Sequence, residues 1–241
     1  MIDMSSIFTH KDYAPTLSRF KSSDCNWSIF QDLHKSLSND KCPICEVQLN
    51  NKPSSPYLAT IDHFRPKAMY TFLKCDPKNY ILMCKLCNST YKDDSFPLLD
   101  ESKKATKIED INKENPLLLN PTKQNPLDFF ELAFRQTSQG GILELKRKQN
   151  IDKGSYEYKI CEITIKLFGL GYCHKYIHPN DDTKECRIGI LAKHYTTFIE
   201  MAEAIRDKNK KALTLILRDR KQELEKYGFF QFIMKKQFVI K

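Results

Sequence analysis

The sequence contains no long apolar run. No point of the 241-residue chain reaches the roughly eighteen consecutive apolar residues that a transmembrane helix needs. Its first residues, MIDMSSIFTHKDY, lack the basic start and the apolar segment of a secretory signal peptide. Internal repeats and low-complexity segments are also missing. We therefore expect a globular, cytoplasmic protein that does not contact a membrane.

Cysteine is abundant, but its arrangement does not indicate a disulfide framework. The nine cysteines are an odd number in a chain that is large and has no secretory signal. Four of them form two C-x-x-C pairs. The other five lack ligand spacing, and we expect them to be reduced and mostly buried; they are Cys25, Cys75, Cys161, Cys173 and Cys186.

The two C-x-x-C pairs predict a structural zinc site. Cys42 with Cys45, and Cys84 with Cys87, each bring two thiolates together from one tight turn. Four soft ligands fill a tetrahedral shell, so the site is closed and structural rather than catalytic. Redox-active C-x-x-C pairs are the alternative. The long insertion between the pairs means that zinc would clamp both ends of a substantial segment.

The positive charge is concentrated toward the C-terminus. The net charge is +9, and residues 141–241 alone hold 21 Lys and Arg against 13 Asp and Glu. Such a surplus fits a polyanionic partner, because neutralising phosphates releases counterions. An ordinary solvated basic face is the alternative.

Composition and periodicity divide the chain into four regions. Residues 1–40 are an N-terminal helical segment, whose predicted helix over 23–38 has Ser23 or Asp24 as N-cap. Residues 41–100 hold the cysteine pairs and two strand-like runs, YLATID and NYILMC. Residues 101–128 read as an extended connector anchored by Leu117–Leu119. Residues 129–241 predict a hairpin around Gln139–Gly141, followed by a mainly helical basic lobe.

The C-terminal lobe carries three helical stripes and an apolar end. The stripes begin near Tyr156, Ile190 and Leu213, and the first of them ends at Gly169. The terminal run 229–240 either docks a partner or completes the fold of its own lobe. His174 and His178 have spacing for a second metal, but nearby glycine and proline make a regular helix there doubtful. His194 reads as a core histidine.

A polar constellation lies between the cysteine pairs. The run Thr60–Lys67 is a strand that ends in Asp62 and His63, and Asn79 and Asn88 follow further along. Adjacent strand residues point to opposite faces, so Asp62 and His63 share a site only if the chain bends there. Taken singly, the Asp-His pair can be a surface feature, and each asparagine a turn or cap residue.

Together these residues resemble the ββα-metal, or HNH, nuclease motif in its zinc-stapled form. The motif runs C-x-x-C, D-H-x-x-P, then N-Y/L-x-x-x-C-x-x-C-N/H and a following lysine, and the chain has these landmarks in order from Cys42 to Lys92, with three residues between Asn88 and Lys92. The resemblance implies an α+β fold in which a zinc-stapled ββα-metal core precedes the helical lobe. It implies His63 as general base and Asp62 and Asn88 as metal ligands. Asn79 would brace the loop that carries the base.

The implied chemistry is hydrolysis of a phosphodiester. Histidine can deprotonate water near neutral pH, and a cation can neutralise charge on the phosphate and the departing oxygen. Asn88 stands where histidine is common, and its carbonyl oxygen suits Mg2+, with Mn2+ as a substitute. Arg65, Lys67 and Lys92 lie nearby in sequence and can grip phosphates; ordinary exposed cations are the alternative.

A longer-range resemblance adds a biological setting. The Cys45-Glu46 pair, the 62–66 segment, the Pro116–Pro121 connector and the Thr164–Leu170 helix resemble the PtuB nuclease family of Septu-type and retron-associated anti-phage systems. The resemblance implies a defence role and an ATPase partner subunit. We expect DNA cleavage; the alternatives are an RNA-cleaving nuclease and a silent zinc-stapled nucleic-acid-binding adaptor.

Overall fold

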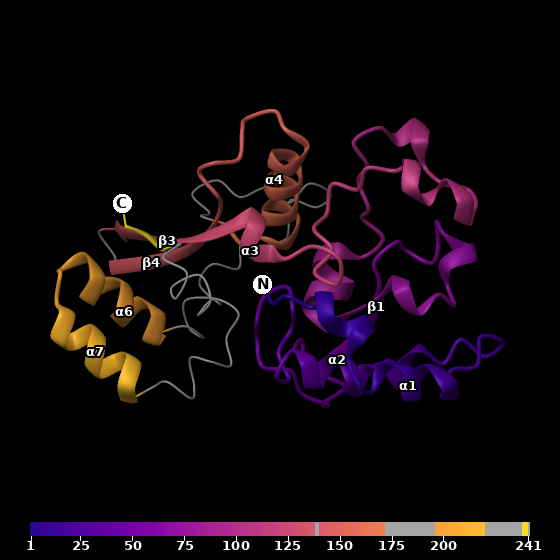
Figure 1. Ribbon diagram of the computed structural model, residues 1–241, viewed down its shortest axis with the longest axis horizontal. Helices are drawn as coiled ribbons and strands as arrows, with labels where there is room; N and C mark the ends of the chain where they lie inside the picture. The colour runs from indigo at the N-terminus through magenta and orange to yellow at the C-terminus, as the bar shows by residue number, and fades with distance from the viewer. Residues whose placement is uncertain (138–139, 172–195, 220–237, 241) are drawn as a thin grey trace.

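A computed structural model describes residues 1–137, 140–171, 196–219 and 238–240, and Figure 1 shows their arrangement. The N-terminal segment and the strands β1 and β2 form one side of the molecule. The hairpin β3–β4 runs from the middle toward the helices α6 and α7 on the other side, and α4 lies beside it. Confirmed features are the mixture of helices with small antiparallel sheets and a cluster of cysteines.

The N-terminal segment consists of short helices. They are η1 (Ser5–Thr9), α1 (Tyr13–Arg19), η2 (Trp27–Phe30) and α2 (Gln31–Leu37). The single helix predicted over 23–38 is thus divided in two and begins later, and the expectation that Ser23 or Asp24 caps it is wrong. The reason is local: Cys25 has a positive φ of 46°, which takes the chain out of a helical path just before Trp27.

A two-stranded sheet forms the centre of the 41–100 region. Strand β1 (Ala59–His63) pairs in antiparallel register with β2 (Tyr80–Cys84), so that Asp62 lies opposite Ile81 and His63 opposite Tyr80. Both strand-like runs of the sequence are therefore confirmed. All five residues of β2 are buried. Helix η5 (Leu86–Lys92), a π-helix, follows β2 directly. Short turns η3 (Thr71–Leu73) and η4 (Pro77–Asn79) lie in the loop between the strands.

The second sheet has the order β4-β3-β5. Strands β3 (Phe130–Thr137) and β4 (Gly140–Arg147) form the predicted hairpin. Strand β5 (Phe238–Ile240) pairs with β3 in parallel through residues 132–134. The described end of the apolar C-terminal run, residues 238–240, therefore completes the sheet of its own lobe, as the internal-packing alternative predicts.

The 101–128 connector is less extended than predicted. It contains η6 (Glu101–Lys103), η7 (Ile108–Lys113) and the start of α3 (Pro126–Phe129). Acidic residues in the first turns favour all three short helices, and the Asp100 and Asn125 side chains cap η6 and α3. The apolar anchor is confirmed, because Leu118 and Leu119 are buried.

In the described part of the C-terminal lobe, helices lie where the apolar stripes of the sequence predict them. Helix α4 (Tyr156–Phe168) ends at Gly169, whose φ of 63° is the left-handed conformation that favours glycine. Helices α6 (Thr196–Arg206) and α7 (Lys210–Asp219) follow. None of the described helices is long and apolar enough to cross a membrane. Cys173, His174, His178, Cys186 and His194 lie outside the described residues.

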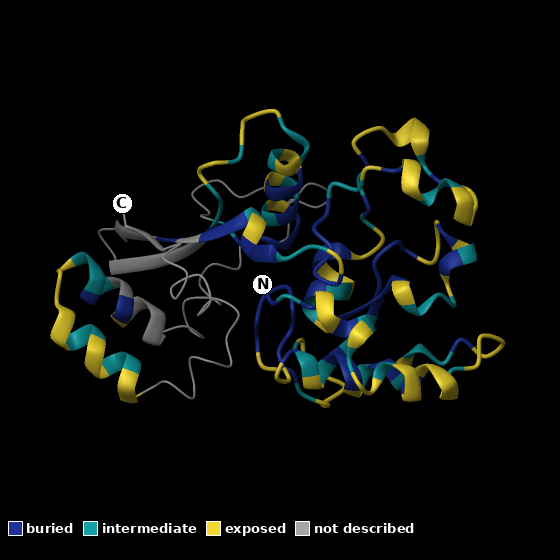
Figure 2. Ribbon diagram, in the orientation of Figure 1, coloured by how far each residue is buried: buried dark blue, intermediate teal, exposed yellow. Residues whose placement is uncertain are grey.

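Buried residues form two clusters, visible as the dark segments of Figure 2. The larger surrounds the cysteines and continues through β2, the connector and α4. The smaller joins Ile7, Phe30 and Leu33 of the N-terminal helices to Tyr80 of β2, with Trp27 and Ile61 packed against it. The N-terminal helices thus cover one side of the β1–β2 sheet, next to His63.

Candidate metal centre and histidine site

Four buried cysteines from two distant turns meet at one point. Their sulfur atoms all lie within 4.8 Å of one another. Cys42 Sγ is 3.7 Å from Cys87 Sγ, and Cys45 Sγ is 3.8 Å from Cys84 Sγ. Four zinc–sulfur bonds of about 2.3 Å in tetrahedral directions place sulfurs about 3.8 Å apart, so the cluster has the dimensions of a zinc site.

The backbone around the cysteines is shaped to support sulfur ligands. The N–H of Cys84 donates to Cys42 Sγ, and the N–H of Cys87 donates to Cys84 Sγ, each at 3.3 Å. Contacts with the Cys42 and Cys45 thiols, followed by burial, raise the pKa of the Cys84 thiol. A soft divalent cation fits this donor set, because binding would stabilise the thiolate form of all four sulfurs.

His63 is the last residue of β1, and its ring is held by a hydrogen bond and by contacts with two aromatic rings. The Nε2 atom lies 2.9 Å from the carbonyl oxygen of Lys74. A carbonyl can only accept, so Nε2 carries the proton and the neutral ring keeps its lone pair on Nδ1. The rings of Trp27 and Tyr80 stand edge-on to His63 at centroid distances of 5.1 and 5.2 Å.

The environment favours the neutral form of His63. Burial lowers the pKa of the imidazole, the hydrogen bond to Lys74 opposes this, and the nearby ammonium groups of Lys67, Lys92 and Lys74 lower it further. At neutral pH the ring is therefore a base with an available lone pair, rather than an imidazolium ion.

Asp62 lies beside a buried lysine. Lys92 Nζ is 2.9 Å from Asp62 Oδ2 and also donates to the carbonyl oxygen of His63 at 3.1 Å. The ammonium contact lacks hydrogen-bond geometry, so Asp62 Oδ2 accepts no hydrogen bond among the described residues. Burial raises the pKa of Asp62, while Lys92 partly offsets this rise. A buried carboxylate oxygen is a suitable ligand for a hard cation once the ammonium group of Lys92, 2.9 Å away, shares or leaves it.

Asn79 closes the loop that follows His63. Its Oδ1 accepts from the backbone N–H of Arg65 at 2.8 Å, and its Nδ2 donates to the Arg65 carbonyl at 2.9 Å. The Asn79 carbonyl accepts from the N–H of Phe64 at 2.8 Å. These bonds turn the chain immediately after β1.

Asp62 lies on one face of β1, and Asn88 of η5 contacts the same face through Thr60. Asn88 Nδ2 donates to Thr60 Oγ1 at 3.0 Å, and Lys92, one turn further along η5, reaches Asp62. Thr60 and Asp62 are two residues apart and so point to the same side of the strand. His63 points to the other side, toward the N-terminal helices. The structure thus brings Asp62 and Lys92 into contact and joins Asn88 to the nearby Thr60, whereas the His63 ring lies on the opposite side of the strand end.

The three predicted phosphate contacts have different environments. Arg65 is buried, and its Nε donates to Glu114 Oε2 at 2.7 Å. Glu114 also accepts from the Tyr70 hydroxyl and the Ala105 N–H, which joins the connector to this module. Lys92 is 1% exposed. Phosphate contact by Arg65 or Lys92 would require these pairs to open.

Lys67 is the exposed member of the three. Its Nζ lies 5.0 Å from the centroid of the Trp27 ring, and Trp27 in turn contacts His63. The proximity of Trp27 was missed in the sequence, where the residue appears only as part of a packing stripe. An aromatic residue two positions after an isolated cysteine gives no recognisable signal.

Two of the five scattered cysteines are not reduced. Cys25 and Cys75 form a disulfide across 50 residues of sequence, which corrects the expectation for this pair. Cys161 is a buried free cysteine, as predicted. The error has a physical cause: disulfide pairing depends on Cα atoms that meet in space, here 5.1 Å apart, and not on sequence spacing.

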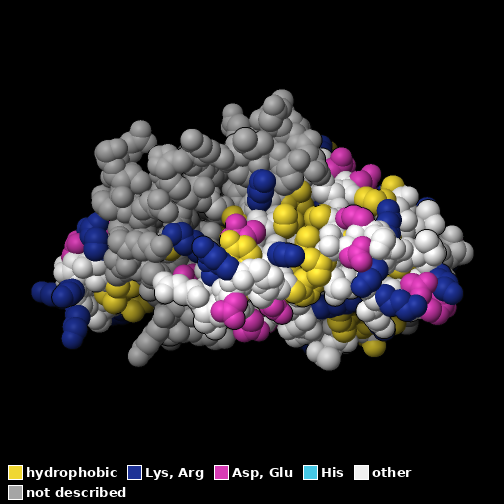
Figure 3. Space-filling model, turned by 90° about the horizontal axis from the view of Figure 1, so that it is seen from above, with side chains coloured by type: hydrophobic (Ala, Val, Ile, Leu, Met, Phe, Trp, Pro, Cys, Tyr) yellow, Lys and Arg dark blue, Asp and Glu magenta, His cyan; other side chains and the backbone are white. Residues whose placement is uncertain are grey.

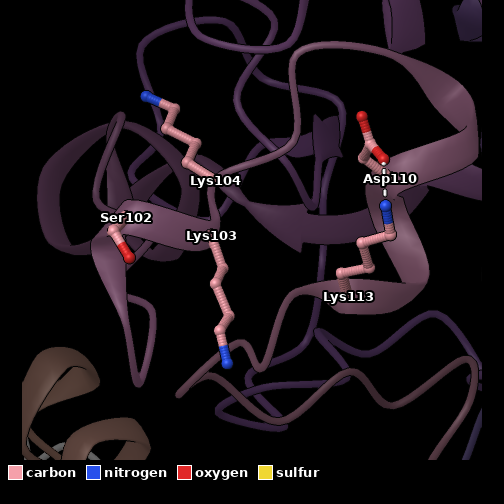
Figure 4. A pocket seen from close by; sticks show the side chains of 5 residues that line it. All are labelled: Ser102, Lys103, Lys104, Asp110 and Lys113. Carbon is pink, nitrogen blue, oxygen red and sulfur yellow. Dashed lines mark hydrogen bonds and ion pairs between the residues drawn. The ribbon is translucent and has the colours of Figure 1, made fainter.

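Among the described residues, the pocket between η6 and η7 and the face in Figure 3 do not gather side chains of one charge around a common point. Figure 4 shows a pocket between η6 and η7 in which Lys103 and Lys104 point in different directions, while Lys113 is paired with Asp110 at 2.8 Å. On the face in Figure 3, Lys and Arg side chains are interspersed with Asp and Glu around a hydrophobic area. The described part of that face therefore presents no purely basic track.

Comparison with known proteins gives one relationship. Septu protein PtuB of Bacillus mycoides (strain KBAB4) is 30% identical to this chain over 143 residues. The chain is similar to a Septu protein. The match covers 54% of this chain and 45% of PtuB, so the chain spans less than half the length of that relative. No family model matches, and no solved structure matches.

The similarity to PtuB makes the chain Septu-related over about half of its length. The four-cysteine cluster is a separate observation, because it comes from the geometry of the fold. The two together describe a Septu-related chain with a site that can hold a metal ion such as zinc.

Proposed function

We propose that the chain is a metal-dependent HNH-type endonuclease that hydrolyses phosphodiester bonds, with DNA as substrate. His63 is the general base, Asp62 and Asn88 hold Mg2+ or Mn2+, and zinc on the four cysteines is structural. The observation that carries the proposal is the state of His63. A neutral ring with its proton on Nε2 and its lone pair on Nδ1 is the form that can deprotonate water.

The surroundings of His63 support this role. The order of strand, strand and helix from β1 through β2 to η5 is the order that the ββα-metal motif requires. Asn79 holds the turn after His63 through both atoms of its amide, so it acts as a positioning residue. The ring of Tyr80 further restricts the orientation of His63.

Two oxygen-bearing residues support a hard cation. Asp62 Oδ2 is buried and ion-paired with Lys92 at 2.9 Å, and the Asn88 amide nitrogen donates to Thr60 Oγ1. That bond leaves the amide oxygen as the ligand atom of Asn88. Mg2+, when bound, neutralises charge on the scissile phosphate and on the leaving oxygen. Lys92 competes for the same Asp62 oxygen, so cation binding has to move or share this ammonium group.

The similarity to PtuB supports a role in anti-phage defence. The family resemblance of the sequence implies an ATPase subunit as the partner in that role. An ATPase partner also suits the nearly neutral charge of residues 1–140, which hold 18 Lys and Arg against 17 Asp and Glu, because a partner can deliver or activate substrate.

The test is a cleavage assay on the full chain. Zinc-loaded protein is incubated with plasmid DNA or with total RNA in Mg2+, in the presence and absence of an ATPase encoded beside its gene. We expect His63→Ala to lower cleavage about 100- to 10,000-fold while folding and nucleic-acid binding persist. His10→Ala, at a partly exposed position remote in sequence from the site, is the matched control.

The pH dependence gives a second readout. Because burial lowers the pKa of His63, the base stays neutral to lower pH than an ordinary imidazole near 6.5. The acid limb of the rate profile should therefore lie below that value. Wild-type cleavage rates in the His63→Ala protein would refute the mechanism.

A further inference from the structure

The Cys25–Cys75 disulfide joins two segments that both contact His63. Cys25 is 8% exposed and lies just before η2, whereas Cys75 is partly exposed and lies between η3 and η4. The bridge therefore connects the N-terminal helices to the loop between β1 and β2.

Each cysteine has a neighbour that touches the histidine ring. Trp27, two residues after Cys25, stands edge-on to His63 at 5.1 Å. Lys74, directly before Cys75, supplies the carbonyl oxygen that accepts from His63 Nε2 at 2.9 Å and from the Tyr80 hydroxyl at 3.0 Å. The disulfide thus ties together the aromatic wall and the hydrogen-bonding wall around one ring.

The wall that carries Lys74 consists of the three-residue turns η3 and η4. It is held by the buried side chain of Leu73 and by the Tyr80 hydroxyl, and the bridge adds a covalent tie to the N-terminal helices. A cross-link limits the positions that this loop can take relative to the N-terminal helices. Without the link, the Lys74 carbonyl can move away from Nε2, and the proton can then occupy either ring nitrogen.

We propose that Cys25 and Cys75 form a reversible modification site for low-molecular-weight thiols and their disulfides, and that the bridge sets the tautomer and position of His63. The bridged form is the active form. The effect on cleavage rests on the proposed nuclease function, whereas the effect on His63 does not.

Glutathione can open the bridge in two thiol–disulfide exchange steps. On reduction, one glutathione thiolate attacks the Sγ of Cys75, the more exposed residue of the pair, and the Cys25–Cys75 bond breaks as a mixed disulfide forms. A second thiolate attacks the glutathione sulfur of that mixed disulfide and releases glutathione disulfide. The protein gains two electrons and two protons, and both cysteines become thiols. Oxidation by glutathione disulfide reverses each step.

The experiment compares the full-length, zinc-loaded protein in reduced and oxidised glutathione buffers, with Cys75→Ser and the control Cys161→Ala. Peptide mapping reports the bridge, and elemental analysis confirms that zinc is retained. Trp27 is the only tryptophan in the chain, so fluorescence follows the environment beside Cys25. Nitrogen-15 imidazole shifts, assigned by difference with His63→Ala, report the tautomer of His63.

We expect the bridge to form in the oxidised buffer, with His63 held as the Nε2–H tautomer. Reduction, or Cys75→Ser, should mix the tautomers and lower cleavage about tenfold, while Cys161→Ala behaves as wild type. If Cys25 and Cys75 stay thiols in oxidised buffer, or if His63 is unchanged when the bridge opens, the proposal is wrong. A tautomer change with no cleavage in either state would support it and refute the nuclease function instead.

Discussion

Two lysines of the same region show how strongly the environment changes what one residue type does. Lys92 is buried between Asp62 Oδ2 and the His63 carbonyl, so its ammonium group is part of the internal charge balance. Lys67 is exposed and lies over Trp27, where an ammonium group stays hydrated and can reach a phosphate. Both lysines are close to the predicted site residues in sequence, yet of the two only Lys67 is placed for contact with a substrate.

Replacing each lysine by methionine should separate these roles. Lys92→Met leaves the Asp62 carboxylate buried without its cation, and we expect a loss of about 3 kcal/mol in the free energy of unfolding. Lys67→Met should leave stability unchanged and weaken nucleic-acid binding, with a shallower dependence on salt. Denaturant unfolding and binding titrations at several salt concentrations measure the two effects. Equal stability losses in both variants would contradict the assignment.

At the scale of elements, the cysteine cluster fastens three pieces of structure. Cys42 and Cys45 lie in the turn after the N-terminal helices, Cys84 ends β2, and Cys87 lies in η5. Strand β2 supplies Tyr80 behind His63, and η5 supplies Asn88 and Lys92. A metal at the cluster therefore supports the candidate site from outside, without contacting its reacting groups.

We expect one zinc ion per chain. Cys84→Ser combined with Cys87→Ser should release it and unfold the β2–η5 region, since metal binding contributes to folding in closed four-ligand sites. Elemental analysis with a thermal melt measures both outcomes. Cys161→Ser is the matched control, because Cys161 is also buried but lies outside the cluster. Soluble, folded wild-type protein with no zinc would overturn this prediction.

At the scale of the whole molecule, the last described strand, β5, pairs with β3 from the middle of the chain. Strand β5 pairs with β3, more than a hundred residues earlier in sequence, and β3 in turn pairs with β4. The C-terminal strand therefore belongs to the sheet that lies between the two sides of the molecule in Figure 1.

Deleting residues 238–241 should accordingly reduce stability rather than remove only a docking contact. The loss of the parallel pairing should cost about 2 kcal/mol, through lost backbone hydrogen bonds. A thermal melt and co-purification with the ATPase test this. A truncated protein with an unchanged melting temperature that no longer binds the ATPase would restore the docking interpretation.

Sequence alone was sufficient for the elements whose local periodicity is strong. Alternation and turn residues located β1, β2 and the β3–β4 hairpin, and Gly169 marked the end of α4, because strand and helix periods depend on neighbouring residues. The spacing of the C-x-x-C pairs predicted a cysteine cluster that the fold then formed. These features follow from short-range geometry, which a sequence carries directly.

The tertiary structure decided which side chains meet across long separations. It paired Cys25 with Cys75, joined Arg65 to Glu114 and placed Trp27 against His63. It also buried Lys92 while leaving Lys67 exposed. Each of these outcomes depends on how the N-terminal helices and the connector pack on the β1–β2 sheet. Packing of this kind is set by the shape and burial of whole surfaces, so no spacing of residues along the chain could reveal it.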